Sequence, residues 1–176
     1  MTDALQTLLR SRIADVPDFP KPGIIFKDIT PLLADPEAFG ALTRHLAERY
    51  RDAGITQLVG IESRGFIFGA ALAQEMGIGF TLVRKPGKLP RATRSASYEL
   101  EYGTDELHMH ADGLSSADRV VVVDDVLATG GTAEACARLV ESTGATIYEF
   151  AFLMELSFLP GRDKLGARDA YAVLSY

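Results

Sequence analysis

Two adjacent carboxylates stand directly before a turn of glycines and threonines in the middle of the chain. Asp124-Asp125 follows four valines, Val120–Val123, and precedes Thr129-Gly130-Gly131-Thr132. Glycine backbones at the start of a helix can present several N–H groups to one anion, and threonine hydroxyls add further donors. The paired acids suit sugar hydroxyls or a hydrated cation, not a phosphate. A ligand with both a phosphate and neighbouring hydroxyls, such as a sugar phosphate, satisfies both halves of the motif.

The residues around this motif predict a strand, a turn and a helix. The valines are β-branched on both faces, which is typical of a buried central parallel strand that ends where the acids begin. Ala133–Val140 is rich in alanine and predicts a helix. The motif is neither a P-loop nor a dinucleotide fingerprint, because it lacks Gly-Lys-Ser/Thr and Gly-x-Gly-x-x-Gly. A plain strand-turn-helix is the alternative, and the paired acids with Thr-Gly-Gly-Thr outweigh it.

A second polar turn has a similar design. Gln57–Ile61 predicts a strand, Glu62-Ser63-Arg64-Gly65 follows it, and a helix is expected from about Phe66 to Met76. Open α/β sheets bind ligands at the carboxyl ends of their parallel strands. Arg64 by itself could be a solvated turn residue. Beside a second phosphate-type turn at the same edge, a contact with pyrophosphate is the better interpretation.

A basic segment and a hairpin follow. Arg84–Arg94 carries five positive charges and no acid, in a chain of net charge −6. A solvated basic loop is one interpretation; a loop that closes over a polyanion and excludes water is the other. Tyr98–Tyr102 and Glu106–His110 flank Gly103-Thr104-Asp105 and predict a hairpin, which would bring Glu101 to the same site. His108 and His110 are expected to be exposed strand residues.

The N-terminal segment predicts a short amphipathic helix, because Leu5, Leu8, Leu9 and Ile13 have helical spacing. Asp15–Gly23 contains three prolines and a glycine and predicts an extended connection without a regular element. Ile24–Asp28 is an apolar run outside any obvious sheet. It is either a packed edge segment or a lid over a flat base, on which Phe26 would stack.

Length, charge and composition narrow the function classes. A chain of 176 residues corresponds to one domain of soluble-globular composition. Its net charge of −6 argues against non-specific nucleic-acid binding. Its single cysteine, Cys136, excludes an internal disulfide and is expected to be an inert packed thiol. No apolar run reaches the about 18–20 residues that span a bilayer, and the N-terminus lacks a signal layout, which predicts a cytoplasmic protein.

The rest of the chain predicts further elements of an α/β fold. Gly79–Val83 and Ala145–Met154 are expected to be strands. Pro160-Gly161 predicts a turn, Arg162–Leu165 a helical turn and Ala170–Ser175 a last strand. These C-terminal residues carry no pattern that indicates chemistry.

Taken together, the motifs resemble the type I phosphoribosyltransferases, and most closely the adenine-specific members of that family. The matching segments run in family order across most of residues 18–132: Asp18–Pro20, Pro22–Asp28, Glu62–Phe66, Val83–Pro90, Tyr98–Gly103 and Val121–Thr132. Val121–Thr132 resembles the family's signature for phosphoribosyl pyrophosphate (PRPP). Lys27 and Glu62 stand where relatives often carry Arg and Asp.

The resemblance implies a fold and a reaction. The implied fold is α/β, with a mostly parallel central sheet flanked by helices in a single domain, residues 1–176. A small N-terminal hood at about residues 1–33 would bind the base, and a flexible loop and hairpin at about residues 84–110 would cover the active site. The implied reaction transfers the phosphoribosyl group of PRPP to adenine, giving AMP and pyrophosphate in purine salvage. Magnesium (Mg2+), held mainly by PRPP, pyrophosphate and water, and a homodimer without nucleic-acid or membrane partners are also implied.

The resemblance also implies a role for each site residue. Glu101 would be the acid/base at the imidazole nitrogens of the purine, and Arg64, Lys85 and Lys88 would hold pyrophosphate, with Arg84 reaching in from a neighbouring subunit. Ala128, Thr129, Gly130, Gly131 and Thr132 would bind the ribose phosphate, and Asp124 and Asp125 the ribose hydroxyls. Phe26 and Leu127 would sandwich adenine, while Ile25 and Lys27 contact its edge. Glu62 and Ser63, joined by a cis peptide, and Tyr102 complete the expected substrate-binding set.

Two alternatives stay open on the sequence. One is a phosphoribosyltransferase for hypoxanthine, guanine or xanthine, which would differ only in contacts to the edge of the base. The other is a non-catalytic PRPP-sensing regulator on the same fold. A DNA-binding regulator would need an added basic or helix-turn-helix segment, which the short N-terminal helix and the net charge of −6 do not supply.

Overall fold

The computed structural model describes residues 2–99 and 103–176. The chain divides into two compact units, Met1–Arg49 and Tyr50–Tyr176. The first unit contains α1 (Thr2–Arg10), β1 (Ala14–Pro17), β2 (Ile25–Asp28), α2 (Thr30–Ala34) and most of α3 (Pro36–Tyr50). The Asp35 carboxylate accepts hydrogen bonds from the backbone N–H groups of Glu37 and Ala38, which caps α3 before Pro36.

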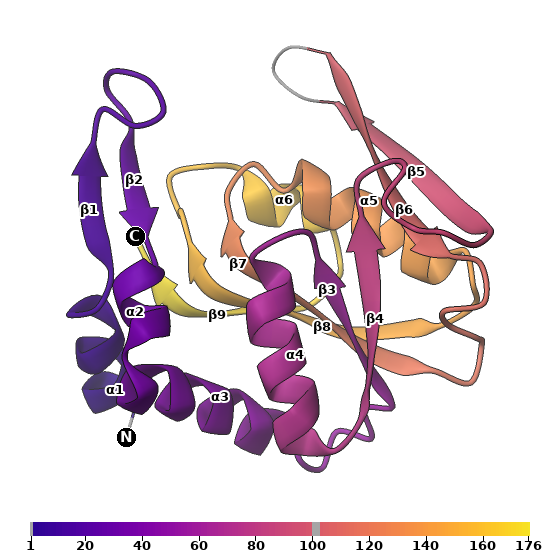
Figure 1. Ribbon diagram of the computed structural model, residues 1–176, viewed down its shortest axis with the longest axis horizontal. Coiled ribbons are helices and arrows are strands. Elements are labelled where there is room, and N and C mark those ends of the chain that lie inside the picture. The colour runs from indigo at the N-terminus through magenta and orange to yellow at the C-terminus, as the bar shows by residue number, and fades with distance from the viewer. Residues whose placement is uncertain (1, 100–102) are drawn as a thin grey trace. The chain divides into compact units, whose positions relative to one another are not determined.

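The strands β1 and β2 form an antiparallel pair, from Ala14 opposite Asp28 to Pro17 opposite Ile25 (Figure 1). The expectation of an extended connection followed by a run outside any sheet was therefore wrong. The prolines do not prevent pairing because Pro17 ends its strand and the others lie in the turn, where they remove no ladder hydrogen bond. In that turn the Asp18 carboxylate accepts a hydrogen bond of 2.7 Å from the Gly23 N–H.

The second unit is built on a seven-stranded sheet in the order β5-β6-β4-β3-β7-β8-β9 (Figure 1). Its strands are β3 (Gln57–Ile61), β4 (Gly79–Arg84), β5 (Thr93–Glu99), β6 (Thr104–His110), β7 (Arg119–Leu127), β8 (Thr146–Glu155) and β9 (Ala170–Ser175). Neighbouring strands among β4, β3, β7, β8 and β9 pair in parallel. In the hairpin, β6 pairs antiparallel with β4, and β5 pairs antiparallel with β6. The predicted α/β fold with a mostly parallel sheet is confirmed.

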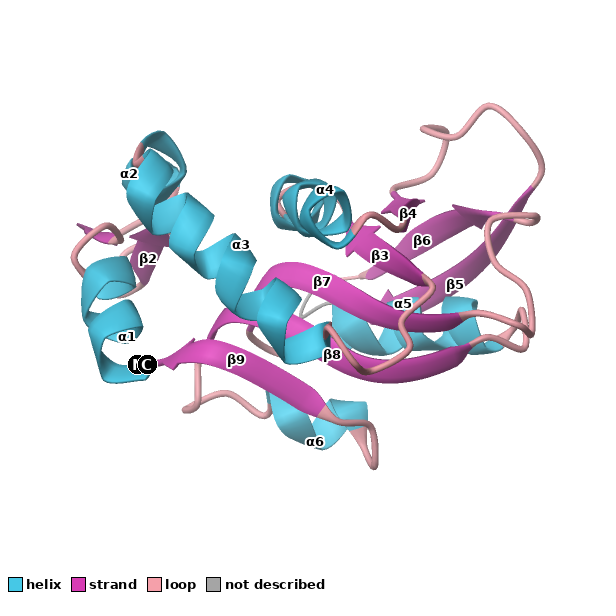
Figure 2. Cartoon of the chain, turned by 90° about the horizontal axis from the view of Figure 1, so that it is seen from below, coloured by secondary structure: helices cyan, strands magenta, loops and turns pink. Residues whose placement is uncertain are grey.

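Helices cover both faces of this sheet. α4 (Gly65–Met76) lies on one face, and α5 (Gly131–Glu141) and α6 (Gly161–Leu165) lie on the other (Figure 2). The chain leaves β3 towards β4 on one side, but leaves β7 towards β8 and β9 on the opposite side. Because parallel crossovers are right-handed, these two directions place their helices on opposite faces.

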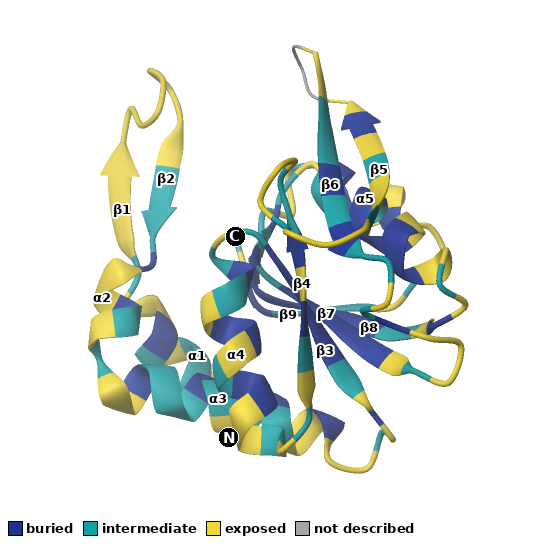
Figure 3. Ribbon diagram, turned by 45° about the vertical axis from the view of Figure 1, so that its right-hand side comes forward, coloured by how far each residue is buried: buried dark blue, intermediate teal, exposed yellow. Residues whose placement is uncertain are grey.

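The centre of the sheet is the apolar core of this unit (Figure 3). Val120–Val123 are each at most 1% exposed, as a strand covered on both faces requires. Cys136 on α5 is fully buried, and this burial raises the pKa of its thiol above the ordinary value, so the thiol stays neutral. None of the helices in the two described ranges has the length and hydropathy that a bilayer span needs.

Two predicted boundaries were wrong. β7 does not end at the acids but continues to Leu127, because β8 pairs with it as far as Leu127 opposite Glu155. The hairpin begins at Thr93, not at Tyr98, because β5 pairs with β6 from Thr93 opposite His110 onwards. The hairpin histidines are half-buried, not exposed.

The first residue of α4, Gly65, packs directly against the backbone of β7. A Cβ atom built on Gly65 would lie 2.6 Å from the carbonyl oxygen of Val123 and 3.0 Å from a carboxylate oxygen of Asp124. The first of these is a backbone atom that no side-chain rotation can remove. Gly65 therefore brings the turn after β3 next to the acids of β7.

We expect Gly65→Ala to lower the free energy of unfolding by about 1–3 kcal/mol, the usual cost of overpacking. Gly79→Ala is the matched control, because a Cβ there would meet only the Gln57 side chain, at 3.2 Å or more. Urea denaturation of the two variants measures the difference. Equal stability of the two variants would show that α4 can move away from β7.

Candidate active site

The two predicted polar turns meet at one edge of the sheet. β3 and β7 are parallel neighbours, paired from Gln57 opposite Val120 to Gly60 opposite Val123. Glu62–Gly65 follows β3, and the β7–α5 loop, Ala128–Thr132, follows β7. Strand order reverses between β3 and β7. This reversal is the switch point at which open α/β sheets form a ligand crevice.

A cavity of about 410 Å³ lies at this position. It is large enough for a small metabolite. It is lined by Glu62, Ser63, Arg64, Lys85, Tyr98, Asp124, Asp125, Val126, Leu127, Ala128, Thr129, Gly130, Thr132 and Ala133. The structure thus brings both polar turns and Lys85 from the basic segment to one cavity.

The two acids lie partly in the core and face a cation. The Arg64 Nε lies 3.0 Å from a carboxylate oxygen of Asp125, which is 4% exposed. Burial raises the pKa of both carboxyls above the ordinary value; the like charge of Asp125 reinforces the shift for Asp124, and Arg64 opposes it for Asp125. An Asp124 oxygen accepts the Asp125 N–H at 2.9 Å. The pair is therefore suited to hydroxyl groups that donate hydrogen bonds.

The β7–α5 loop leads directly into α5. Gly130 has φ of 82°, a left-handed conformation that favours glycine, and its carbonyl oxygen accepts the first helical bond from the Glu134 N–H at 2.9 Å. The preceding amides at residues 131–133 have no partner within the helix. With the positive end of the helix dipole, they form the kind of site that binds a phosphate.

Lys85 is held at the cavity by the hairpin. Its Nζ donates a hydrogen bond of 2.8 Å to the Tyr98 hydroxyl and forms an ion pair with the Asp105 carboxylate. The Tyr98 hydroxyl donates to the same carboxylate at 3.0 Å. Burial lowers the pKa of Lys85, but the hydrogen bonds that its amine donates to Asp105 and Tyr98 outweigh burial and raise the pKa, so the amine is charged.

Glu62 links the first turn to the basic segment. Its carboxylate accepts hydrogen bonds from the Lys85 N–H at 2.9 Å and from Arg84 Nε at 3.2 Å. Burial opposes the shift, but these donors hold the pKa of Glu62 below its ordinary value. The peptide between Glu62 and Ser63 is cis, as expected. Lys88 is exposed outside the cavity, and its carbonyl oxygen accepts from Arg84.

Three of the predicted base-binding residues, Ile25, Phe26 and Lys27, lie in the first unit, whereas Leu127 lines the cavity of the second unit. Ile25 is 59% exposed, and the Phe26 ring packs edge-on against Phe19 with 5.1 Å between centroids. Lys27 forms an ion pair of 2.6 Å with Asp15. The catalytic residue expected at Glu101, and Tyr102, lie outside the described residues.

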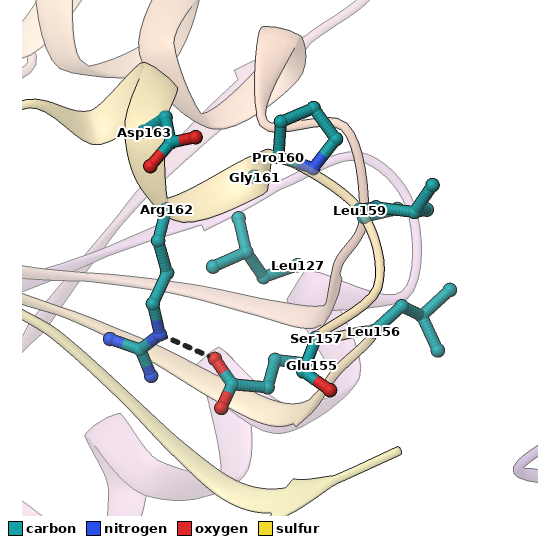
Figure 4. Close-up of a pocket in the computed structure, with 10 residues that line it drawn as sticks. Leu127, Glu155, Leu156, Ser157, Leu159, Pro160, Gly161, Arg162 and Asp163 are labelled. Carbon is teal, nitrogen blue, oxygen red and sulfur yellow. Dashed lines mark hydrogen bonds and ion pairs between the residues drawn. The ribbon is translucent and has the colours of Figure 1, made fainter.

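The sequence pointed to no role for a second cavity next to the first. It has a volume of about 300 Å³ and extends from Leu127 and Ala128, which line both cavities, to the α6 turn (Figure 4). Its lining residues are Leu127, Ala128, Glu155, Leu156, Ser157, Leu159, Pro160, Gly161, Arg162 and Asp163. Tyr98 in the first cavity was also missed. Only the Pro160-Gly161 dipeptide gave a local signal, and it indicated a turn.

Replacing Asp124 by Asn is expected to stabilise the fold increasingly as the pH rises. The raised pKa of Asp124 means that the folded protein binds this proton more tightly than the unfolded chain, so stability is lost as pH rises from the ordinary value of 3.8 through the folded pKa. Asn keeps an acceptor for the Asp125 N–H but does not titrate. Urea unfolding of variant and wild type between about pH 4 and pH 8 measures the difference. A difference that stays constant with pH would contradict this account.

Comparison with known proteins agrees with this geometry. The family model "Phosphoribosyl transferase domain" matches residues 29–173. The adenine phosphoribosyltransferase of Streptomyces clavuligerus is 58% identical over 165 residues, which cover 94% of this chain and 93% of that protein. The crystal structure of the enzyme from Thermoanaerobacter pseudethanolicus has a TM-score of 0.93 at 47% identity and full coverage of both chains.

A further solved structure was obtained with ligands. The adenine phosphoribosyltransferase of Saccharomyces cerevisiae, complexed with adenine and an imino-altritol bisphosphate, has a TM-score of 0.93 at 40% identity and covers 98% of this chain and 99% of that one. A family model over most of the chain and relatives above 50% identity over nearly its whole length leave one assignment. The chain belongs to the adenine phosphoribosyltransferases of the type I phosphoribosyltransferase family.

Proposed function

We propose that the cavity at the carboxyl ends of β3 and β7 binds PRPP and is the site at which the phosphoribosyl group is transferred to adenine. The chain has the activity of its family: it forms AMP and pyrophosphate from adenine and PRPP, a reaction of purine salvage. One observation supports the location above all. Both polar turns and Lys85, which are far apart in sequence, line the same cavity.

The loop at Ala128–Thr132 is assigned to the 5′-phosphate of the sugar. Amides at the start of α5 and the threonine hydroxyls are donors without competing acids in the loop itself. Asp124 and Asp125 are assigned to the ribose hydroxyls, because their oxygens accept hydrogen bonds and would repel a phosphate. The order of acids and amides along the chain thus matches the order of hydroxyls and phosphate on the sugar.

Pyrophosphate is assigned to Arg64, Lys85 and Lys88, with Glu62, Ser63 and Tyr102 as further substrate contacts. Arg64 pairs with Asp125 and Lys85 with Asp105, so incoming pyrophosphate would compete with these carboxylates. Before the substrate arrives, Arg64 and Lys85 therefore each have a carboxylate partner. Arg84, which pairs with Glu62 in its own chain, is assigned to a neighbouring subunit's site in a homodimer.

Magnesium is expected to enter with PRPP, since it is typical of the family. The ion would be held mainly by PRPP, pyrophosphate and water, and the carboxylate oxygens of Asp124 and Asp125 would accept hydrogen bonds from that water. When bound, the ion supplies charge neutralisation to the leaving pyrophosphate. The chain's own part is to bind and orient the two ends of the sugar.

Adenine is assigned to Phe26 and Leu127 as stacking partners, with backbone contacts at Ile25 and Lys27. Its ring nitrogen would displace pyrophosphate at the anomeric carbon, which carries positive charge in an oxocarbenium-like transition state. Arg64 and Lys85 stabilise the charge that develops on the leaving pyrophosphate. The hairpin and basic segment would exclude water, which would otherwise hydrolyse the activated sugar.

The test of this function is direct. Purified protein is incubated with adenine, PRPP and magnesium, and AMP is detected; hypoxanthine, guanine and xanthine are assayed in parallel. AMP from adenine at a rate well above the nucleotides from the other bases supports the proposal. A preference for another base would assign a different purine specificity. Binding of PRPP without nucleotide from any base would indicate a regulator.

Glu101→Gln is expected to lower turnover by about 10²–10⁴-fold, the usual contribution of general acid–base catalysis, while PRPP binding survives. Glutamine keeps the size of the side chain but neither gives nor takes the proton. Glu99→Gln, two residues earlier in the sequence, is the control. Turnover that stays at the wild-type level in Glu101→Gln removes this residue from the mechanism.

A further inference from the structure

We propose that the turn at the start of α6 is a positioning element for the β7–α5 loop, and that Gly161 sets the spacing of the loop for the 5′-phosphate of its ligands. The C-terminal segment, to which the sequence assigned no chemistry, thereby gains a function. The proposal rests on the assignment of the loop at Ala128–Thr132 to that phosphate.

The turn and the loop pack backbone against backbone. A Cβ built on Gly161 would lie 2.3 Å from the Ala128 carbonyl oxygen and 2.9 Å from the Leu127 side chain. In the opposite direction, a Cβ built on Gly130 would lie 2.5 Å from the Gly161 carbonyl oxygen and 3.0 Å from its Cα. Gly130 therefore leaves room for the main chain of Gly161, and Gly161 leaves room for the main chain of Ala128. Rotating a side chain relieves neither of these two backbone contacts.

The two glycines are required for different reasons. Gly130 has a positive φ, so its conformation alone disfavours other residues. Gly161 has no such φ, and its backbone would accept alanine. Only the space taken by the loop excludes a methyl group at Gly161. The spacing between loop and turn is therefore a property that a single methyl group would change.

Ion pairs, hydrogen bonds and burial hold α6 against β8, β9 and α5. Arg162 pairs with Glu155 at the end of β8 at 2.6 Å (Figure 4). It also donates a hydrogen bond of 2.9 Å to the Ala170 carbonyl oxygen on β9. Leu165 is 1% exposed in the core. Arg168, just after α6, forms two hydrogen bonds to Glu141 at the end of α5. An added methyl group at Gly161 would thus displace the loop more readily than α6.

This geometry predicts which ligands Gly161 affects. A displaced loop lowers the affinity for every ligand that carries a 5′-phosphate, namely PRPP, AMP and ribose 5-phosphate. Pyrophosphate, assigned to Arg64 and Lys85 on the other side of the cavity, would keep its affinity. A general loss of stability would instead weaken both classes of ligand. The split between the two classes is the signature of a positioning role.

The test is Gly161→Ala in the full chain. The Kd of ribose 5-phosphate, the Kd of AMP and the KM of PRPP are each expected to rise about 10–100-fold, the range that misplacement of a binding group by about 1 Å can cause. The kcat at saturating PRPP and the Kd of inorganic pyrophosphate should stay within about threefold of wild type. Calorimetric titration and steady-state kinetics give these values.

Two glycine variants are controls. Gly79→Ala changes the start of β4, where a Cβ would meet only the Gln57 side chain. Gly54 follows α3 with φ of 66° and nothing within 4 Å of an added Cβ, so Gly54→Ala adds backbone strain outside α6. Both should bind ribose 5-phosphate as wild type does. Unchanged ribose 5-phosphate affinity in Gly161→Ala, or an equal loss for pyrophosphate, would overturn the proposal.

A second variant covers the case in which Gly161→Ala does not fold. Arg162→Ala removes the pair with Glu155 and loosens α6 without crowding the loop. Arg162→Ala should raise the Kd of ribose 5-phosphate by about two- to fivefold, the effect expected from loss of one partly exposed ion pair. The Kd of pyrophosphate should stay unchanged. No change in Arg162→Ala would then overturn the proposal.

Thr132→Val separates this inference from the assignment of the loop. The variant removes one hydroxyl donor from the loop itself. If Thr132→Val lowers the affinity for ribose 5-phosphate but Gly161→Ala does not, the loop binds phosphate and only the proposed role of α6 is wrong. If Thr132→Val has no effect on ribose 5-phosphate, the assignment of the loop fails first.

Discussion

The parallel pairing of β3 with β7 is the constraint on which the site depends. Because the two strands are in register up to Gly60 and Val123, their carboxyl ends align and both polar turns open at the same edge. Gly65 then allows the first turn to contact the backbone of β7, at a place where any side chain would collide with Val123. Hydrophobic burial of the valine strand supplies the free energy that holds charged residues at this edge.

Three ion pairs connect acidic and basic side chains within the candidate site. Asp125 faces Arg64, Lys85 faces Asp105, and Glu62 faces Arg84. Each pair offsets the cost of removing its members from water. A polyanion that enters can take over the cations, while hydroxyl groups can satisfy the acids. The proposed ligand, with phosphates at its ends and hydroxyls between them, fits these pairs.

Local patterns predicted the elements that carry their own signals. Gln57–Ile61, the helix that ends before Gly77 and the last strand at Ala170–Ser175 were expected within a residue of their bounds, because hydrophobic periodicity and glycine mark them. The β1–β2 pair, the extension of β7 through its acids, the Tyr98–Asp105 partners of Lys85 and the packing of Gly161 on the loop were not found. Each of these is decided by a partner strand or segment elsewhere in the chain, so no local pattern announces it.

A crystal structure with ribose 5-phosphate and pyrophosphate tests the central claim, that the two turns grip opposite ends of one activated sugar. The account predicts the 5′-phosphate on the amides of residues 129–132, the ribose hydroxyls within hydrogen-bonding distance of Asp124 and Asp125, and pyrophosphate against Arg64 and Lys85. Both ligands bound elsewhere, with the loop after β7 empty, would contradict it.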